Sequence, residues 1–210
     1  MPRSSEQLYL ELMTVVRERL DTVNLLASAP DANFAHAEAA ALHGRKVIEG
    51  IAFACLVASQ HGQGFVPRTA RGQWNAERIL DLCSKGTIPF PSPSIIRYAT
   101  EEERKLYNVK CTVAGVPERR IPIRELITMY RRMHPWLHEL NPYASPTRGE
   151  FYRQNGQQLW DALARIDRFI ERHCITIAGR GFFCVLRDRV DNQTKVLPLQ
   201  KIEEIPELQS

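Results

Sequence analysis

The chain has 210 residues, of which 44% are hydrophobic and 25% charged, and its 28 basic and 24 acidic side chains give a formal net charge of +4. These values exclude an intrinsically disordered chain, which has fewer apolar residues and a less balanced charge. A chain of this length can bury one good core and is short for two, so we expect a single domain over residues 1–210. The mild basic excess permits an anionic partner without requiring one.

The sequence shows no sign of export or membrane insertion. Its most apolar stretch, Val47 to Ala58, contains Glu49 and is too short to span a bilayer, and the first residues contain no apolar signal region. The five cysteines are scattered without a Cys-x-x-Cys pair, which favours free thiols in a reducing compartment. We therefore expect a cytoplasmic protein that does not contact a membrane.

The first third of the chain has helical periodicity. Ser4 and Gln7 form a capping-box pattern that begins a first helix, which ends before Pro30. A second helix is expected from about residue 33 to residue 61. Between Val47 and Val57 this helix is apolar on nearly every side, which is typical of a helix at the centre of a bundle.

Short elements follow in the middle of the chain. In order, we expect a basic loop over residues 65–72, a helix over 74–84, a capping box at Thr100 and Glu103 that opens a short helix, and a short strand over 111–116. The Pro-rich connection over residues 87–94 is too dense in proline for a helix or a central strand. It is interpreted as an extended surface connection or a hinge.

The last third changes from helical to alternating periodicity. A helix is expected from Pro122 to Leu140 with a kink or break near Arg131 caused by Pro135, and a further helix is capped by Thr147 and Glu150. Three β-rich runs separated by turn residues then predict an antiparallel meander over 174–202, before a tail at 203–210. The predicted fold is mainly α, a helical bundle over residues 4–173 with a small C-terminal antiparallel β-meander (α+β by strict count).

His134 and His138 are the first candidate site. Two histidines four residues apart lie on one face of a helix and can share a metal ion. A zinc site needs a third ligand, which the neighbouring sequence does not supply. Pro135 also stands where a zinc protease would place its glutamate. The alternative is that His138 bonds within a crowded turn and His134 is exposed.

Two further pairs combine an arginine with a histidine on a late helix. They are Arg168 with His173 and Arg132 with His138. In this feature the chain resembles the HEPN superfamily of small helical bundles, many of which are metal-independent ribonucleases or toxins, and which carry an arginine, four to six residues and then a histidine. Where the family usually has a polar residue directly after the arginine, this chain has Phe169 or Met133.

The resemblance covers the helical part of the chain and not the meander. It implies that Arg168 binds the scissile phosphate and that His173 acts as general acid or base, since a guanidinium pairs well with phosphate and imidazole titrates near neutrality. The alternative is that Arg168 is a solvated residue and that His173 favours the dipole at the end of its helix.

A third cluster is basic. It comprises Arg119, Arg120, Arg124, Arg131 and Arg132, next to Tyr130 and Trp136. Arginine interleaved with aromatic residues suits RNA or single-stranded DNA, but a solvated helix face explains the same pattern. Arg45 and Glu49, four residues apart within the apolar helix, can form an ion pair that we interpret as structural.

The sequence contains none of the common signatures for nucleotide binding, nucleophilic catalysis or zinc fingers, and no cofactor is expected. Three hypotheses remain. The one that we favour is a non-catalytic binding or assembly module, with a protein partner or a second copy of the chain. The others are a HEPN-like ribonuclease or toxin, and a regulator that binds RNA or single-stranded DNA.

Overall fold

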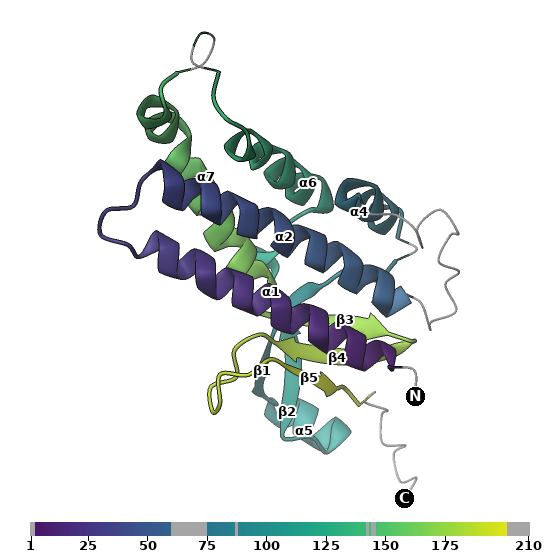
Figure 1. The fold of residues 1–210 in the computed structure, drawn as a ribbon. Helices are drawn as coiled ribbons and strands as arrows, with labels where there is room; N and C mark the ends of the chain where they lie inside the picture. Colours follow the sequence, from purple (N-terminus) through teal and green to yellow (C-terminus); the bar gives the residue numbers. More distant parts are fainter. Residues whose placement is uncertain (1–2, 60–74, 87, 142, 144–145, 201–210) are drawn as a thin grey trace, which may run out of the picture.

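The computed structural model describes residues 3–59, 75–86, 88–141, 143 and 146–200 (Figure 1). The basic loop expected at 65–72 and the tail expected at 203–210 lie outside the described residues.

Two long helices, α1 (Ser5–Ala27) and α2 (Phe34–Ser59), form an antiparallel hairpin (Figure 1). The predicted capping box is confirmed, because the Ser4 side chain accepts from the Gln7 N–H and the Gln7 side chain accepts from the Ser4 N–H. The prediction that Val47 to Val57 forms the centre of the core is also confirmed. In this stretch Ile48, Ile51 and Cys55 are completely buried.

Three further helices and one 3-10 turn pack around α2. They are α4 (Ala76–Ser84), α6 (Ile123–Arg132), η2 (His134–Leu137) and α7 (Arg148–Ile170). The break predicted from Pro135 is confirmed, since α6 ends at Arg132 and the chain continues as η2. Gly44 of α2 permits a close approach here. A Cβ atom at this position would clash with Leu163 of α7 and would lie 2.9 Å from Sδ of Met133, at the end of α6.

The C-terminal meander is confirmed and is part of a larger sheet. Strands β3 (Arg172–Ile177), β4 (Arg180–Val185) and β5 (Lys195–Pro198) are joined by β1 (Ser92–Tyr98) and β2 (Cys111–Gly115) in the antiparallel order β2-β1-β3-β4-β5. Figure 1 shows this sheet at the end of the molecule away from α6.

The interpretation of residues 87–94 as only a connection or a hinge was wrong at its C-terminal end, because Ser92 to Ser94 begin β1. Pro93 is tolerated there because the ladder with β2 starts one residue later, where Ser94 pairs with Gly115. The carbonyl oxygen of Pro93 still accepts from the Val116 N–H, at 2.9 Å. Pro93 therefore stands at the beginning of the ladder between β1 and β2, where the lack of a backbone N–H donor is tolerated.

Strand β1 changes partner along its length. Only Ser92 and Pro93 pair with β3, whereas Ser94 to Tyr98 pair with β2. The second part of β1, the short helix α5 (Glu101–Tyr107) and β2 therefore form a two-stranded projection, which we call the arm (residues 94–115; Figure 1). The predicted Thr100–Glu103 capping box is present at its tip, and Arg97 donates two hydrogen bonds to the Glu103 carboxylate, at 2.6 and 2.8 Å.

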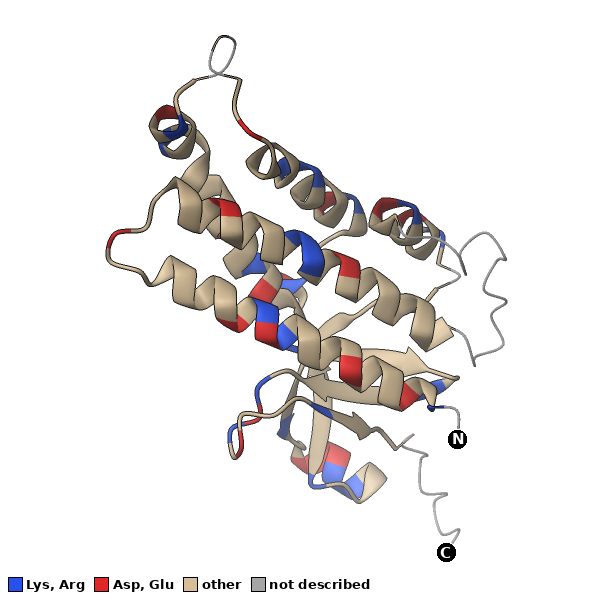
Figure 2. Ribbon diagram, in the orientation of Figure 1, with Lys and Arg blue, Asp and Glu red and all other residues tan. Residues whose placement is uncertain are grey.

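Charged side chains of both signs are interspersed along α1, α2 and α5 (Figure 2). Many charged side chains form ion pairs at the surface, such as Arg3 with Glu11 at 2.6 Å. Exposed pairs of this kind contribute little to stability, so the fold rests mainly on apolar burial around α2.

Candidate functional site

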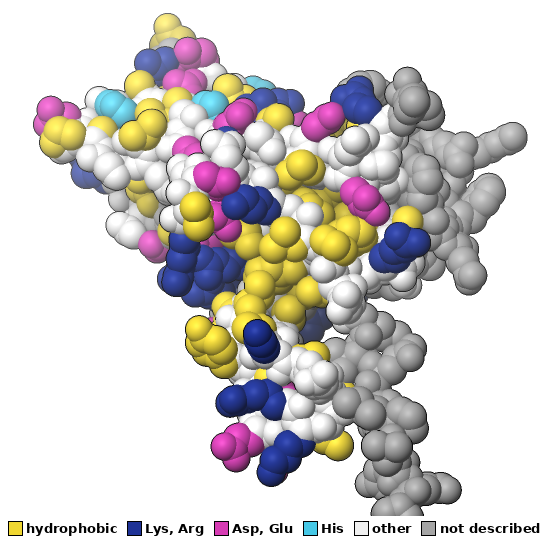
Figure 3. All heavy atoms as spheres, turned by 90° about the horizontal axis from the view of Figure 1, so that it is seen from below, with side chains coloured by type: hydrophobic (Ala, Val, Ile, Leu, Met, Phe, Trp, Pro, Cys, Tyr) yellow, Lys and Arg dark blue, Asp and Glu magenta, His cyan; other side chains and the backbone are white. Residues whose placement is uncertain are grey.

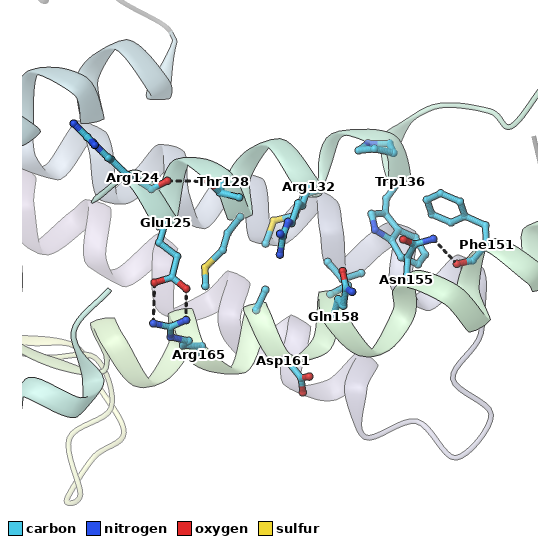
Figure 4. A pocket seen from close by; sticks show the side chains of 15 residues that line it. Arg124, Glu125, Thr128, Arg132, Trp136, Phe151, Asn155, Gln158, Asp161 and Arg165 are labelled. Carbon is cyan, nitrogen blue, oxygen red and sulfur yellow. Dashed lines mark hydrogen bonds and ion pairs between the residues drawn. The ribbon is translucent and has the colours of Figure 1, made fainter. Parts of the chain in front are cut away.

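A groove of about 740 Å³ separates α6 and η2 from α7 (Figure 4). The two helices run in opposite directions along its sides. The groove is lined by Arg124, Glu125, Thr128, Met129, Arg132, Met133, Pro135, Trp136, Phe151, Asn155, Gln158, Leu159, Asp161, Ala162 and Arg165. Its volume is in the range of sites that bind a ligand or a partner side chain.

The floor of the groove is apolar because the buried stripes of α6 and α7 meet there. Met129, Met133, Trp136 and Leu159 line it and are each less than 9% exposed. The absence of a side chain at Gly44 lets Met133 and its neighbours sit close to α2, as described above. The floor is therefore fixed by three helices, and methionine side chains give it a surface that adapts to the shape of an apolar partner.

Contacts connect the two sides of the groove near both of its ends. At one end Glu125 of α6 and Arg165 of α7 form a two-bond ion pair, with 2.9 Å between Nη2 and Oε2 (Figure 4). At the other end the Trp136 ring packs edge-on against Phe151, with 4.8 Å between centroids. These contacts hold α6 and α7 at a set distance while the middle of the groove stays open.

The open middle of the groove carries an uncompensated positive charge. Arg132 points from α6 toward α7, and Gln158 points toward it from the opposite side, whereas the Arg124 guanidinium at the rim points away (Figure 4). Among the residues that the structure describes, Arg124 and Arg132 have no acidic partner within 4 Å, while Arg165 is paired with Glu125. An acidic group that enters the groove therefore meets Arg132 as an available cation.

A second hollow of about 390 Å³ lies next to the groove and shares Arg165 with it. The other lining residues are Glu118, Arg119 and Arg168. Arg119 also lies 3.5 Å from Glu171, which partly offsets the charge of its guanidinium. The structure thus brings together Arg119 and Arg168, which the sequence analysis had assigned to different candidate sites.

The structure does not place Arg168 and His173 in a common site. Arg168 is exposed on α7, whereas His173 is completely buried in β3. The two ring nitrogens of His173 are both occupied: Nε2 lies 2.7 Å from the Tyr9 hydroxyl and Nδ1 lies 2.8 Å from the carbonyl oxygen of Ile170. Burial lowers the pKa of His173 to about 4, so the ring is neutral near pH 7.

Arg132 and His138 do not line the same cavity either. Arg132 faces the groove, whereas His138 is exposed at the end of η2 and its Nε2 lies 3.0 Å from Nε2 of His134. Nδ1 of His134 in turn lies 3.2 Å from the Arg45 guanidinium. The histidine pair predicted for a metal is therefore in contact, but no group of three or more His, Cys, Asp or Glu able to hold a metal occurs in the described part of the chain.

Arg45 and Glu49 do not form the direct ion pair that was predicted: Glu49 pairs with Lys46 at 2.7 Å, and a tyrosine stands between Arg45 and Glu49. Nη2 of Arg45 donates to the Tyr130 hydroxyl at 2.7 Å, and this hydroxyl donates to Oε1 of Glu49 at 3.1 Å. The guanidinium also lies over the Tyr130 ring, 4.1 Å from its centroid. These contacts join α2 to α6 behind the groove, in agreement with a structural role.

The remaining arginines of the predicted nucleic-acid cluster do not form one surface. Arg131 is paired with Glu77 at 2.8 Å, Arg119 lines the second hollow, and Arg124 lies at the rim of the groove. Arg120 is exposed and lines neither hollow. The aromatic residues of the cluster, Tyr130 and Trp136, are 8% and 2% exposed and offer no free ring for a base to stack on.

The sequence analysis missed most of the groove. It assigned no role to Glu125, Gln158 or Arg165, because these residues belong to helices separated by a proline-rich turn and show no motif. Met129 and Ala162, which also line the groove, were likewise not singled out.

No protein-family model, no curated protein sequence and no solved structure matches this chain. None of the helices in the described ranges is both long enough and apolar enough to cross a bilayer.

Proposed function

We propose that the chain is a non-catalytic binding module, and that the groove between α6 and α7 holds an acidic amphipathic helix of a partner protein. The observation that carries this proposal is an apolar floor with an unpaired arginine, Arg132, directed across it. An amphipathic helix covers such a floor with its apolar face and can place a carboxylate beside the guanidinium.

The length of α6, which forms one side of the groove, supports a helix as its occupant. Helix α6 has 10 residues, which corresponds to a length of about 15 Å or roughly three turns of a partner helix. The apolar floor continues beyond α6 to Trp136 in η2. A partner helix of three turns presents two or three apolar anchors on one face, at i, i+3 or i+4 and i+7.

The charge of the groove supports an acidic partner. Arg132 and Arg124 are both without an acidic partner among the described residues, and only Asp161 adds a carboxylate that is not bound to Arg165. Asp161 accepts a hydrogen bond from Gln157 at 2.8 Å, which directs it along α7. A basic helix would be repelled by Arg132, whereas an acidic helix is attracted to it.

The two other hypotheses gain less support. A ribonuclease would need Arg168 and His173 at one phosphate, but His173 is buried and hydrogen-bonded on both sides. Recognition of RNA or single-stranded DNA by stacking would need exposed aromatic rings next to the arginines, but Tyr130 and Trp136 are buried. Both remain predictions that an experiment can decide.

The test uses a set of fluorescein-labelled 15-residue helical peptides. Each peptide carries leucines at i, i+3, i+4 and i+7 and glutamates on the flanks, and a matched set carries lysines instead. We expect saturable binding of at least one acidic peptide by fluorescence anisotropy, and binding of its lysine counterpart about tenfold weaker or more, because the charge contact with Arg132 is replaced by repulsion.

Variants of the protein locate the binding. Ala162→Trp fills the groove and should abolish binding. Arg132→Glu should lower the affinity for the acidic peptide about tenfold. Arg153→Glu, an equal charge change on the exposed side of α7 outside the groove, should leave the affinity unchanged. Equal affinity for acidic and basic peptides, or binding that Ala162→Trp does not affect, would contradict the proposal.

The ribonuclease alternative has its own test. Purified protein is incubated with total RNA in EDTA, and the Arg168→Ala variant serves as the comparison. We expect no cleavage by either protein. Cleavage by the wild type that is lost in Arg168→Ala would favour an enzyme over a binding module.

A further inference from the structure

The two edge strands of the sheet differ in how they are protected. The sheet ends in β2 on one side and in β5 on the other. Strand β5 contains Lys195 and Pro198, and Lys195 is held by Asp188 and Asp191 at 3.0 and 3.1 Å. Lysine and proline on an edge strand hinder its pairing with another chain.

Strand β2 has no such protection. Its five residues, Cys111-Thr112-Val113-Ala114-Gly115, include neither a charged residue nor a proline. Within the described part of the chain, its only pairing is with β1. Helix α5, which joins the two strands, buries none of its residues and sits at the tip of the arm. The outer edge of β2 is therefore a row of backbone donors and acceptors open to another strand.

The arm also exposes large apolar side chains. Ile96, Tyr98 and Leu106 are 50%, 85% and 54% exposed. From Ser94 onward β1 pairs only with β2, and an isolated two-stranded ribbon is marginally stable in water. Figure 3, a view of the molecule from below, shows hydrophobic side chains gathered across the middle of that face, with charged side chains of both signs around them. These features are typical of a surface that is covered by another molecule.

We propose that β2 pairs with β2 of a second copy of this chain, in antiparallel orientation about a two-fold axis at Val113. The two five-stranded sheets then form one continuous sheet. The partner is a second copy because β2 can pair with β2 of another chain without placing unfavourable residues opposite each other. Pairing about Val113 places Cys111 opposite Gly115 and Thr112 opposite Ala114, so that no like charges meet.

The surroundings of β2 fit the same arrangement. The nearest charged residue, Lys110, would lie opposite Val116 of the other copy. The two Lys110 side chains therefore do not face each other. The arm projects from the helical part of the molecule, which leaves room for two copies to approach edge to edge (Figure 1). A partner recognised by charge would find no charged side chain within β2.

The first test measures the mass of the full chain in solution by light scattering, over about 1–100 μM. We expect the wild type to reach twice its monomer mass of 24.1 kDa. Val113→Lys should shift the chain to the monomer mass, because two lysines would face each other at the axis. Leu197→Lys makes a similar change on the protected edge strand β5, where Leu197 is 43% exposed, and should leave the dimer intact.

The second test does not depend on the stability of the Val113→Lys variant. In a Cys111→Ser background, Val113→Cys places two thiols at the axis, where the Cα separation in an antiparallel pair suits a disulfide. Oxidation by diamide, which is itself reduced to the hydrazine, should cross-link this variant and not the matched Leu197→Cys variant. A wild type that is monomeric throughout, a dimer unaffected by Val113→Lys, or equal cross-linking at both positions would overturn the proposal.

Discussion

The centre of α2 and the arm contain similar side chains in opposite environments. Ile48 and Ile51 are completely buried between helices, whereas Ile96 in the arm is 50% exposed and Tyr98 is 85% exposed. Burial of an apolar side chain stabilises a fold by about 1.5–3 kcal/mol, and a side chain left in water provides none of this. The comparison indicates that α2 maintains the fold, while the arm has apolar surface available for association.

The largest loss of stability is expected from truncation in the centre of α2. Ile51→Ala removes a completely buried side chain and leaves a cavity, so the free energy of unfolding should fall by about 2–5 kcal/mol. Urea unfolding followed by circular dichroism measures this change. A loss below about 1 kcal/mol would show that α2 is not the centre of stability.

A second large effect concerns pH, because the core contains His173. In the folded chain burial lowers the pKa of this ring from 6.5 to about 4. Between these values the unfolded chain binds a proton that the folded chain does not, so stability should decrease as the pH falls from about 6.5 to 4. The shift corresponds to about 3 kcal/mol, and the decrease from this group ends once the folded ring is also protonated.

The measurement is the unfolding free energy in urea at a series of pH values. Between pH 6.5 and 4, the imidazole ring of His173 causes part of the decrease in unfolding free energy. This part should disappear in His173→Gln. In the control His138→Gln it should persist, since His138 is exposed. Identical pH dependence in the wild type and His173→Gln would contradict the buried neutral state.

A smaller loss is expected where three helices meet. Gly44→Ala introduces a Cβ that clashes with Leu163 and would lie 2.9 Å from Sδ of Met133, so unfolding should become easier by about 1–3 kcal/mol. The same change at Gly149 in the first turn of α7 meets no atom within 4 Å and should stabilise the chain by up to about 1 kcal/mol. Effects of the same sign at both positions would contradict the close approach at Gly44.

The smallest effect is expected in the arm. Ile96→Ala removes a side chain that is half exposed and opposite Val113, so at concentrations where the chain is monomeric the unfolding free energy should change by about 0.5 kcal/mol or less. Urea unfolding at low micromolar concentration measures it. A loss comparable with that of Ile51→Ala would remove the distinction between the two regions.

Most helix boundaries could be predicted from the sequence because their signals are local. The capping boxes at Ser4, Thr100 and Thr147 are all present, and Pro135 separates α6 from η2 as expected. Each of these signals acts over three or four residues. They are therefore independent of how the rest of the chain packs.

Features that join distant segments could not be predicted in this way. The start of β1 was missed because its proline content argues against a strand, and its pairing partner β3 lies about 80 residues later. His173 was interpreted either as a general acid or base or as a residue at the end of a helix, because the sequence does not show that Tyr9 packs against it. The groove depends on α2, α6 and α7 together, and no single segment carries a signal for it.

The bond between Tyr9 and His173 joins residues that are 164 positions apart in the chain. During synthesis at about 5–20 residues per second, the histidine emerges from the ribosome roughly 10–30 s after the tyrosine. For that interval the bond between Tyr9 and His173 cannot form, so α1 cannot dock in its final form. We therefore expect completion of the core to wait until β3 has left the ribosome, so that a stalled chain lacking β3 exposes α1 and α2 to chaperones and proteases.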